Sequence, residues 1–416
     1  MERTVCFDCE RMLGLILDAG KALIECGGET HRVDDTLNRL AVCYGFTDLN
    51  IWVIPTNIQA TVTGPDGTVC TQVRRILSSG VDFAQLCRLN AFSRWACAEQ
   101  PDEADFAARL REILAQRPQK PWLMTLGAAL GGWGFGLFFG CDLVDSLIAL
   151  VASVMISFLM RRLSVREHNP LILNFLISFA VECLIIGAMR LGAANHMGYI
   201  TVGVVMLLVS GLGTTNGLRD LIHLDTLSGL INLAASFTGA IGIALGIAFP
   251  LMMFSAGGSN EVTGLNSEIL VQIAASGAAC VGFCLWFHVT DRKIVLCAIG
   301  GAMTWAIYSL TARYVPGVFG PTMIASVACG VYGQILARVM RTPATVFTTV
   351  CSLPLIPGGS LYYAMYGLVT KNISLAASKG EALGLTCFGI VLGYMVVEVL
   401  NRAIGPSFRR VRRQAK

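Results

Sequence analysis

The chain has 416 residues, of which 54% are hydrophobic and 14% are charged. Soluble globular domains carry roughly 25% charged residues, so this composition argues against a soluble protein and indicates a polytopic membrane protein. The charge is uneven, because residues 1–120 hold 13 Lys/Arg and 16 Asp/Glu, whereas residues 121–416 hold 18 and 11. A mildly acidic N-terminal part argues against a protein that binds nucleic acid.

Residues 1–120 follow the order helix, helix, strands, helix, helix. Apolar residues recur at helical spacing in 9–28 and 29–45, and again in 82–100 and 102–116. Residues 49–76 hold three β-rich stretches, and the turn sequence "GPDG" separates the last two. The sequence therefore predicts an α+β domain over residues 1–120.

The start of the chain and the cysteines carry little functional signal. "MERTVCFDCERMLG" has mixed charge and no apolar core before a cleavage site, so no signal peptide is expected. The 15 cysteines are scattered, and the single Cys6/Cys9 pair has no second pair or nearby His. We expect reduced thiols in a cytoplasmic domain, with no metal site and no cofactor.

Ten apolar segments near the length of a membrane helix, about 20 residues, follow from Trp122 onward. They lie at 122–140, 144–160, 170–188, 198–217, 228–250, 268–289, 294–311, 321–337, 345–369 and 382–401. Cytoplasmic connections carry an excess of Lys and Arg. With residues 1–120 inside, the inner connections and the tail hold fourteen such residues, and the outer connections hold four. Both termini are therefore predicted to be cytoplasmic.

The ten segments divide into two groups of five at the outer loop "FSAGGSNEVTGLNSE". Five is odd, so the second group must start from the opposite side of the membrane, which is the geometry of an inverted repeat. We predict an all-α polytopic membrane protein with a 5+5 inverted repeat and an N-terminal cytoplasmic α+β domain. The predicted domains are 1–120, 121–256 and 257–416, the last with a basic cytoplasmic tail.

The ninth segment is interrupted by Pro354, Pro357, Gly358 and Gly359. Proline and glycine weaken a spanning helix, whose backbone groups must be satisfied internally. In the inverted repeat the ninth segment corresponds to the fourth, and aligning the two pairs Gly358 with Gly211. Transporter sites often lie where two discontinuous helices face each other, with helix N-termini that attract carboxylates. The alternative is a purely structural kink in each helix.

Three ordered motifs resemble the threonine/serine exporter family, which also includes two-subunit dicarboxylate (succinate) exporters. They are "GGETHRVDDTLNRL" in the N-terminal domain, "NGLRDLIHLDTLSG" after the fourth segment and "PLIPGGSLYY" in the ninth. Two departures are present: Ser210-Gly211 replaces the family's Pro-Gly, and Leu224-Asp225 replaces its Gly-Asp. The resemblance implies export of a small amino acid or a dicarboxylate across the bacterial inner membrane, driven by protons.

The polar residues of the membrane segments each have a functional and a structural interpretation. Asn174, Ser178 and Glu182 recur at every fourth residue and form one stripe, in which Glu182 is either a proton-coupling acid or a structural hydrogen-bonding group. Arg219 either binds a substrate carboxylate through two hydrogen bonds or anchors the helix at the inner face. One of Tyr362 and Tyr363 is expected to face a cavity.

The acids at the start of the second helix of the N-terminal domain could suggest a metal or hydrolytic centre. Acids at a helix start are also explained by the helix dipole, and the domain has no second His. We expect no catalytic residues, and we expect Arg74 and Arg75 to pair with these acids. The N-terminal motif residues are Glu29, Thr30, Arg32, Asp35 and Arg74.

The sequence thus predicts a secondary transporter, with a dicarboxylate exporter, a channel and a membrane-anchored hydrolase as alternatives. Its partners are a small-molecule substrate, protons and the lipid bilayer, not nucleic acid, and association of copies of the chain is left open. The predicted substrate-binding residues are Ser210, Gly211, Thr214, Thr215, Asn216, Arg219, Pro357, Gly358, Gly359, Ser360 and Tyr362. The predicted proton-coupling residues are Glu182, Asp220 and Asp225.

Overall fold

The computed structural model describes residues 8–77, 80–116, 120–167, 169–209, 211–222, 224–254 and 265–414. The chain divides into two compact units. The N-terminal unit contains the residues up to 119 together with Phe287–Val289 and Arg341–Val346, and the helical unit contains the rest. Each unit is described separately below.

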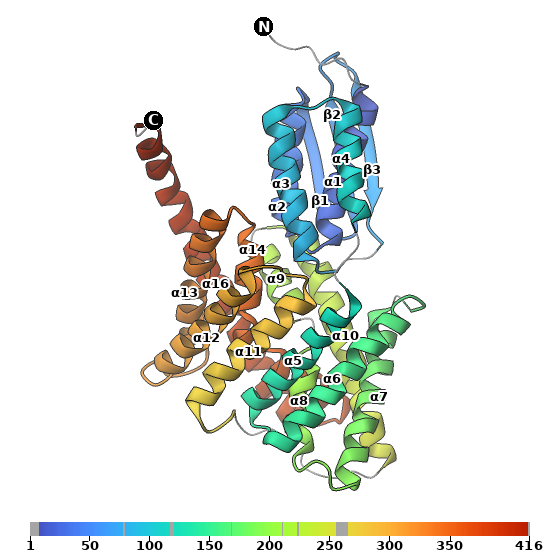
Figure 1. The fold of residues 1–416 in the computed structure, drawn as a ribbon, viewed down its shortest axis with the longest axis vertical. Coiled ribbons are helices and arrows are strands. Elements are labelled where there is room, and N and C mark those ends of the chain that lie inside the picture. The colour runs from blue at the N-terminus through green and yellow to red at the C-terminus, as the bar shows by residue number, and fades with distance from the viewer. Residues whose placement is uncertain are drawn as a thin grey trace. The chain divides into compact units, whose positions relative to one another are not determined.

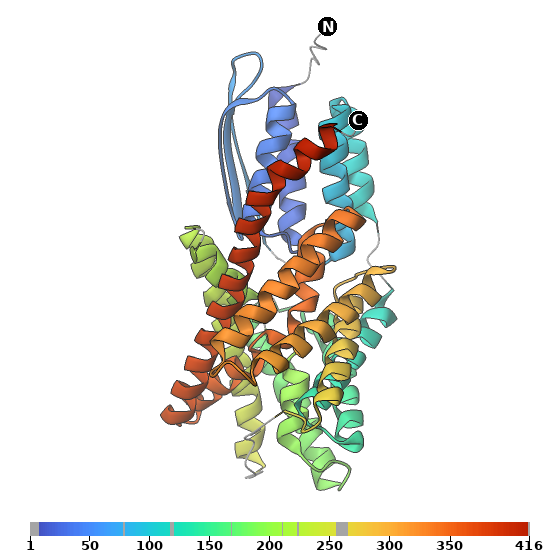
Figure 2. The same cartoon turned by 90° about the vertical axis from the view of Figure 1, so that its left-hand side faces the viewer.

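The N-terminal unit consists of four helices and a three-stranded antiparallel sheet in the order β1-β2-β3. Its elements are α1 (Cys9–Glu25), α2 (Thr30–Cys43), β1 (Thr47–Ile54), β2 (Asn57–Thr63), β3 (Val69–Arg75), α3 (Phe83–Glu99) and α4 (Glu103–Ala115). The helices cover one face of the sheet (Figure 2). Aspartates cap three of these helices: Asp8 for α1, Asp82 for α3 and Asp102 for α4.

Side chains from the helices and the sheet form one apolar core in this unit. Leu13 and Ile16 of α1, Leu37 of α2, Ile58 of β2 and Phe106 of α4 are fully buried. The β2–β3 hairpin closes through the expected "GPDG" turn, in which Gly67 has φ +80°, a conformation that favours glycine. The predicted order of helices and strands is the order observed.

The helical unit contains twelve helices along the described residues (Figure 1). They are α5 (Pro121–Phe139), α6 (Leu143–Leu163), α7 (Pro170–Arg190), α8 (Met197–Val205), α9 (Gly211–Ile222), α10 (Thr226–Met253), α11 (Ile269–Trp286), α12 (Lys293–Thr311), α13 (Phe319–Met340), α14 (Ala344–Cys351), α15 (Gly358–Val369) and α16 (Ile373–Gln414). The first residues of α14 belong to the N-terminal unit.

Within the described residues, eight helices are long and apolar enough to cross a membrane. A ninth span is possible if α14 and Leu353–Val369 are counted together, although this pair bends by 43°. The protein is therefore a mostly helical polytopic membrane protein. The predicted fourth segment is divided into two short helices, α8 and α9, and the ten-span arrangement stays a prediction.

Glycines bring α5 and α11, and α10 and α7, into backbone contact. A Cβ atom on Gly282 of α11 would lie 2.2 Å from the Gly131 nitrogen of α5. On α10, a Cβ on Gly242 would lie 2.4 Å from the Leu171 oxygen of α7. Small residues allow membrane helices to approach closely and gain packing energy. These glycines therefore fix the neighbours of each helix.

The same glycine spacing occurs in two helix pairs. Gly242 and Gly246 of α10 pack against Leu171 and Phe175 of α7. Gly389 and Gly393 of α16 pack against Phe319 and Met323 of α13. The glycines are four residues apart in both helices, and so are the carbonyls that they approach. The α10–α7 and α16–α13 pairs therefore pack in the same way.

One predicted helix boundary was wrong. Helix α16 begins at Ile373, nine residues before the predicted 382, because Lys379 and Glu381 lower the hydropathy of a stretch that is nevertheless helical. Helix α11 ends at Trp286, close to the predicted 289. The chain turns there because His288 adopts a left-handed φ of 59° and Phe287–Val289 fold with the N-terminal unit.

Candidate functional site

The two discontinuous segments of the helical unit meet at their breaks. Helix α8 ends at Val205, and a turn over 206–208 precedes the start of α9 at Gly211. Helix α14 ends at Cys351, and a 3-10 turn (Leu353–Leu355) precedes the start of α15 at Gly358. A Cβ on Gly358 would lie 2.8 Å from Met206 Sδ and 3.5 Å from Val209 Cγ1. The start of α15 therefore packs directly against the break that follows α8.

A cavity of about 210 Å³ opens at this place. The ninth segment lines it at Pro354–Pro357, Gly359 and Ser360, and Met206 contributes from the other break. Thr322 and Thr386 add two further polar residues. The remaining wall is largely aromatic, with Phe135, Phe138, Phe139, Trp305 and Tyr308. Such a mainly apolar cavity with a few polar groups is typical of a small-molecule site.

The first turn of α15 gives this cavity a positive helix end. Pro357 precedes the helix, and no side chain caps its N-terminal amides. Gly359 and Ser360, the second and third helical residues, both line the cavity. The free N–H groups and the dipole of a helix N-terminus attract carboxylates and other anions. The cavity can therefore hold the carboxylate of a small solute.

The polar residues of α9 are placed differently. Thr214, Thr215 and Asp220 are buried, and Asp220 Oδ2 accepts a hydrogen bond of 2.9 Å from Asn232 Nδ2 on α10. The Arg219 guanidinium lies 5.1 Å from the ring centre of Tyr394. In the part of the chain that the structure describes, the cavity lining includes none of Thr214, Thr215, Asn216 and Arg219. These residues form a second polar region beside the break.

Three further predicted residues lie near the two ends of α9. Ser210 lies outside the described residues, and Gly211 is the first residue of α9. Asp225 is exposed at the start of α10. The preceding Leu224 adopts a left-handed φ of 68°, which explains why a glycine suits this position in the family motif.

Glu182 of α7 is buried against α8, the helix that precedes the break. Its side chain is 1% exposed, and Oε2 accepts a 3.0 Å hydrogen bond from Thr201 Oγ1 of α8. Tyr362 is also 1% exposed and lies close enough to Glu182 for the two groups to interact electrostatically. Thr201 was not singled out from the sequence, because a lone threonine among apolar residues carries no local signal. Its pairing with Glu182 depends on how α7 and α8 pack.

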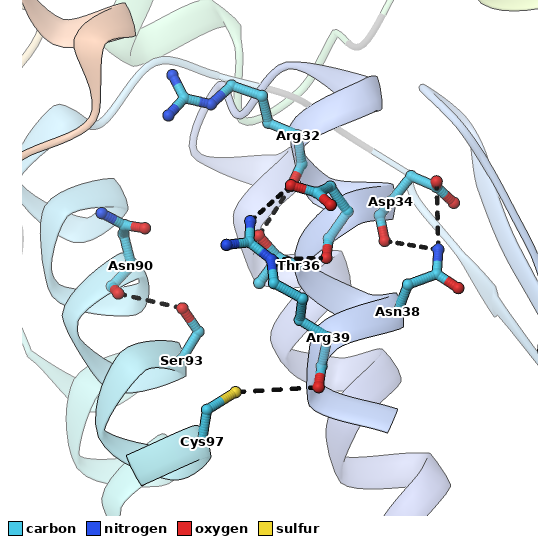
Figure 3. Close-up of polar contacts among 9 residues, drawn as sticks. Arg32, Asp34, Thr36, Asn38, Arg39, Asn90, Ser93 and Cys97 are labelled. Atoms are coloured by element: carbon cyan, nitrogen blue, oxygen red, sulfur yellow. Dashed lines mark hydrogen bonds and ion pairs between the residues drawn. The ribbon is translucent and has the colours of Figure 1, made fainter. Parts of the chain in front are cut away.

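In the N-terminal unit, the motif residues hold the stretch Arg341–Val346. Thr345 Oγ1 donates to Glu29 Oε1 and accepts from the Arg32 guanidinium, both at 3.1 Å. Figure 3 shows Arg32 extending away from α2, while Thr36 Oγ1 donates to the Arg32 carbonyl oxygen. Thr30 is buried at the start of the helix. The motif therefore has a structural role within this unit.

Two arginines of the N-terminal unit form ion pairs with acids of the same unit. One of these pairs contradicts a prediction from the sequence. Arg39 lies 2.6 Å from Asp35, one turn earlier on the same helix. Arg74 donates to Asp18 Oδ1 at 2.6 Å and to the Gly14 carbonyl oxygen at 3.3 Å. The prediction that Arg74 pairs with the acids at the start of α2 was therefore wrong, because β3 lies beside α1 and faces its acid instead.

A second stretch is held through Asp82, the capping residue of α3. Asp82 Oδ2 lies 2.9 Å from His288 Nδ1, and the Phe83 amide donates to the Phe287 carbonyl oxygen at 2.9 Å. Burial raises the pKa of Asp82, but hydrogen bonds from His288 and the Gln85 amide outweigh burial and leave that pKa below its ordinary value. Asp82 therefore stays ionised and keeps Phe287–Val289 in place. No residue pattern in the sequence indicates this contact.

Among the described residues, one group of three possible metal ligands comes together: Asp142, Asp145 and His196. Asp145 is fully buried and accepts from the backbone amides of Asn195 and His196 and lies 3.0 Å from His196 Nδ1. Asp142 caps α6 and accepts from Asn195 Nδ2 at 2.7 Å. These hydrogen bonds already use the carboxylates, so the group fits a structural role that fixes the start of α8.

Comparisons with known proteins cover nearly the whole chain. A family model described as "Putative threonine/serine exporter" matches residues 14–254, and a second, described as "Threonine/Serine exporter, ThrE", matches residues 272–400. The chain is 22% identical over 423 residues to a "Probable threonine/serine exporter" of Mycobacterium tuberculosis, covering 95% of this chain and 78% of the relative. It is 24% identical over 403 residues to a "Threonine/serine exporter" of Corynebacterium glutamicum, covering 90% and 76%.

No solved structure matches the chain. The two family models together cover the N-terminal motif, the α9 motif and the break before α15. The first alone spans more than half of the 416 residues. The chain belongs to the threonine/serine exporter family.

Proposed function

We propose that this protein exports a small amino acid of the threonine or serine type across a membrane. The observation that carries the proposal is the meeting of two broken helices at Gly358, beside a cavity of about 210 Å³. Secondary transporters bind their solutes where discontinuous helices face each other near the middle of the membrane. The names of the two relatives, both called threonine/serine exporters, supply the substrate class.

The solute carboxylate binds at the N-terminus of α15, where Gly359 and Ser360 line the cavity. The helix dipole and free amides stabilise the negative charge there. Arg219 on α9 attracts the carboxylate on the cytoplasmic approach and can hold it through two parallel hydrogen bonds. Pro357, Thr214, Thr215 and Asn216 shape the path between the two regions.

Ten spans in two inverted halves account for the packing of the helical unit. The matched glycine contacts of α10 with α7 and of α16 with α13 support this repeat, as does the close α5–α11 contact between the first helices of the halves. The distribution of Lys and Arg supports cytoplasmic termini. The bacterial relatives support a place in the inner membrane.

Export is coupled to protons through a buried carboxylate. Glu182 is the first candidate, because an acid buried among membrane helices is costly and therefore marks a functional position. Asp220 is the second candidate, and the exposed Asp225 is the third. Export of the solute and its coupling to protons can be tested separately, because export can proceed without proton coupling.

The N-terminal unit acts as a gating domain and has no hydrolytic activity. Support comes from its hydrogen bonds to Thr345 and His288, which fasten the two stretches of chain that lead into α14 and out of α11. Because α14 is the first part of the broken ninth segment, a change in the unit reaches the break through the chain itself. Phosphatase or esterase turnover in the purified protein that is lost in a His31→Ala/Asp35→Ala variant would contradict this assignment.

Counterflow in proteoliposomes tests the proposed function. Vesicles containing the full-length protein are loaded with unlabelled threonine, serine or succinate, and uptake of the labelled form of the loaded solute is followed. We expect threonine and serine to drive uptake and succinate to have no effect, with empty vesicles as the control. Uptake driven by succinate alone would assign the protein to the dicarboxylate exporters, and the absence of uptake with all three solutes would contradict the transporter assignment.

A further inference from the structure

A group of buried polar atoms without hydrogen-bond partners lies on α7 and α15, two helices that both pack against α8. Ser178, Glu182 and Tyr362 are at most 2% exposed. Within the described residues, Ser178 Oγ, Glu182 Oε1 and Tyr362 Oη have no hydrogen-bond partner. Glu182 and Tyr362 interact electrostatically, and Ser178 is one helical turn from Glu182 on the same face of α7. Three unsatisfied groups therefore lie in one region.

This arrangement is costly unless something binds to it. Buried polar groups in folded proteins are almost always hydrogen-bonded, because each unpaired group loses its interaction with water and gains none in exchange. Phenylalanine at position 362 and alanine at position 178 would fill nearly the same space without that cost. Retaining two hydroxyls and a carboxylate oxygen indicates a polar ligand that pairs with them in another state of the transport cycle.

The group lies next to the proposed carboxylate site. Gly359 and Ser360 in the first turn of α15 line the cavity, and Tyr362 lies in the following turn. A Cβ on Gly359 would approach Val202 Cγ1 at 3.5 Å, and the neighbouring Thr201 is the residue that donates to Glu182. An amino acid whose carboxylate binds the helix N-terminus thus has its side chain within one turn of these atoms.

We propose that Tyr362, Ser178 and Glu182 recognise the side-chain hydroxyl of the transported amino acid. The proposal rests on the proposed function and names the feature of the substrate that is selected. A hydroxyl has one hydrogen to donate and two lone pairs to accept with. It donates to Glu182 Oε1 and accepts from the Tyr362 and Ser178 hydroxyls, which satisfies all three unpaired groups at once.

The consequence is selection against amino acids of the same shape that lack the hydroxyl. Valine matches threonine in shape but replaces the hydroxyl with a methyl group, so it leaves the three groups unpaired. Sites built to bind a substrate hydroxyl reject such analogues strongly, whereas apolar pockets discriminate weakly. Succinate is also disfavoured, because it would place a second carboxylate beside Glu182.

The test compares Tyr362→Phe with Tyr363→Phe in proteoliposomes of the full-length protein. The measured quantity is the ratio of the threonine and valine concentrations that halve uptake of labelled serine. We expect Tyr362→Phe to reduce the preference for threonine about tenfold or more, with valine competing better than in the wild type. Tyr363→Phe removes the neighbouring hydroxyl on the same helix and should leave the preference within about twofold of the wild type.

A second pair of variants keeps the test decisive if Tyr362→Phe does not fold. Ser178→Ala should also weaken the preference for threonine, whereas Ser153→Ala should not, because Ser153 is buried on α6 and bonded to the Ala149 carbonyl oxygen. An unchanged preference in Tyr362→Phe or Ser178→Ala, with serine uptake intact, would overturn the inference and leave the exporter assignment standing. Failure of the wild type to take up serine or threonine would instead contradict the proposed function.

Discussion

The two broken segments of the helical unit differ in how they break and in what they contribute. The break between α14 and α15 contains Pro354 and Pro357 and forms a 3-10 turn. The described part of the break between α8 and α9 contains no proline, and α8 ends in a plain turn over 206–208. Residues of the break between α14 and α15 line a cavity, whereas the break between α8 and α9 leads into α9, which carries Arg219 and the buried Asp220.

This difference indicates a division of labour. In the proposed function the ninth segment recognises the solute through shape and the helix dipole, so its residues should be sensitive to added volume. The fourth segment is proposed to act through charged side chains, so its residues should be sensitive to charge and geometry. Substitutions in the two segments can therefore separate the two contributions.

The largest effect is expected from adding volume at the ninth break, with Gly358→Leu. Even a Cβ at this position lies 2.8 Å from Met206 Sδ, so a leucine must push the two breaks apart. Misplacing a binding site by about 1 Å can reduce the rate roughly a hundredfold, and we expect a loss of that size in threonine counterflow. Gly384→Leu on α16 is the control, because a Cβ there meets nothing within 4 Å. Equal transport by both variants would remove the ninth break from the site.

A smaller effect is expected from Arg219→Lys in the fourth segment. Lysine keeps the charge but loses the planar guanidinium that binds a carboxylate through two hydrogen bonds. The half-saturating threonine concentration should rise about tenfold, which corresponds to about 1.4 kcal/mol, with a similar maximal rate. Arg166→Lys in the connection after α6 should leave both parameters unchanged. An unaltered affinity in Arg219→Lys would make this residue an anchor at the membrane face.

The smallest effect on the rate of exchange is expected from Glu182→Gln. Glutamine preserves the size of the side chain and can still accept from Thr201, but it cannot exchange a proton, and its amide NH2 replaces the oxygen that faces the substrate hydroxyl. Threonine-for-threonine exchange should persist with a weaker preference for threonine over valine, while stimulation of export by a pH gradient disappears. Glu381→Gln, an exposed acid on α16, serves as the control. Retained stimulation in Glu182→Gln, together with its loss in Asp220→Asn, would transfer the coupling role to Asp220.

Several features could be predicted from the sequence because they depend on residues that are close together in the chain. Pro354, Pro357 and the following glycines leave a helix no means of continuing, and the structure breaks there. The fold of α1 to α4 with a central hairpin also follows from periodicity and the "GPDG" turn. Membrane character follows from composition alone, because a chain with 14% charged residues cannot cover a soluble surface.

Other features depend on how the helices pack, and they could not be predicted from the sequence. The contact between Thr201 and Glu182, the hydrogen bonds from Thr345 to the N-terminal motif and the Asp82–His288 pair all join residues from different elements. Their partners are set by how helices pack, which one-dimensional spacing does not record. The start of α16 was misplaced for a related reason, since the charged Lys379 lies over the Tyr363 ring and is compatible with a helix there.

The central claim is that the two breaks form one solute site, and a double-mutant cycle between Gly358 and Met206 tests it most directly. Gly358→Ala adds a methyl group 2.8 Å from Met206 Sδ, and Met206→Ala removes the atom that it meets. We predict that Gly358→Ala weakens threonine affinity about tenfold and that the double variant recovers to within about threefold of the wild type, a coupling of about 0.5–3 kcal/mol. Wild-type affinity in Gly358→Ala, or effects of the two substitutions that simply multiply, would contradict the account.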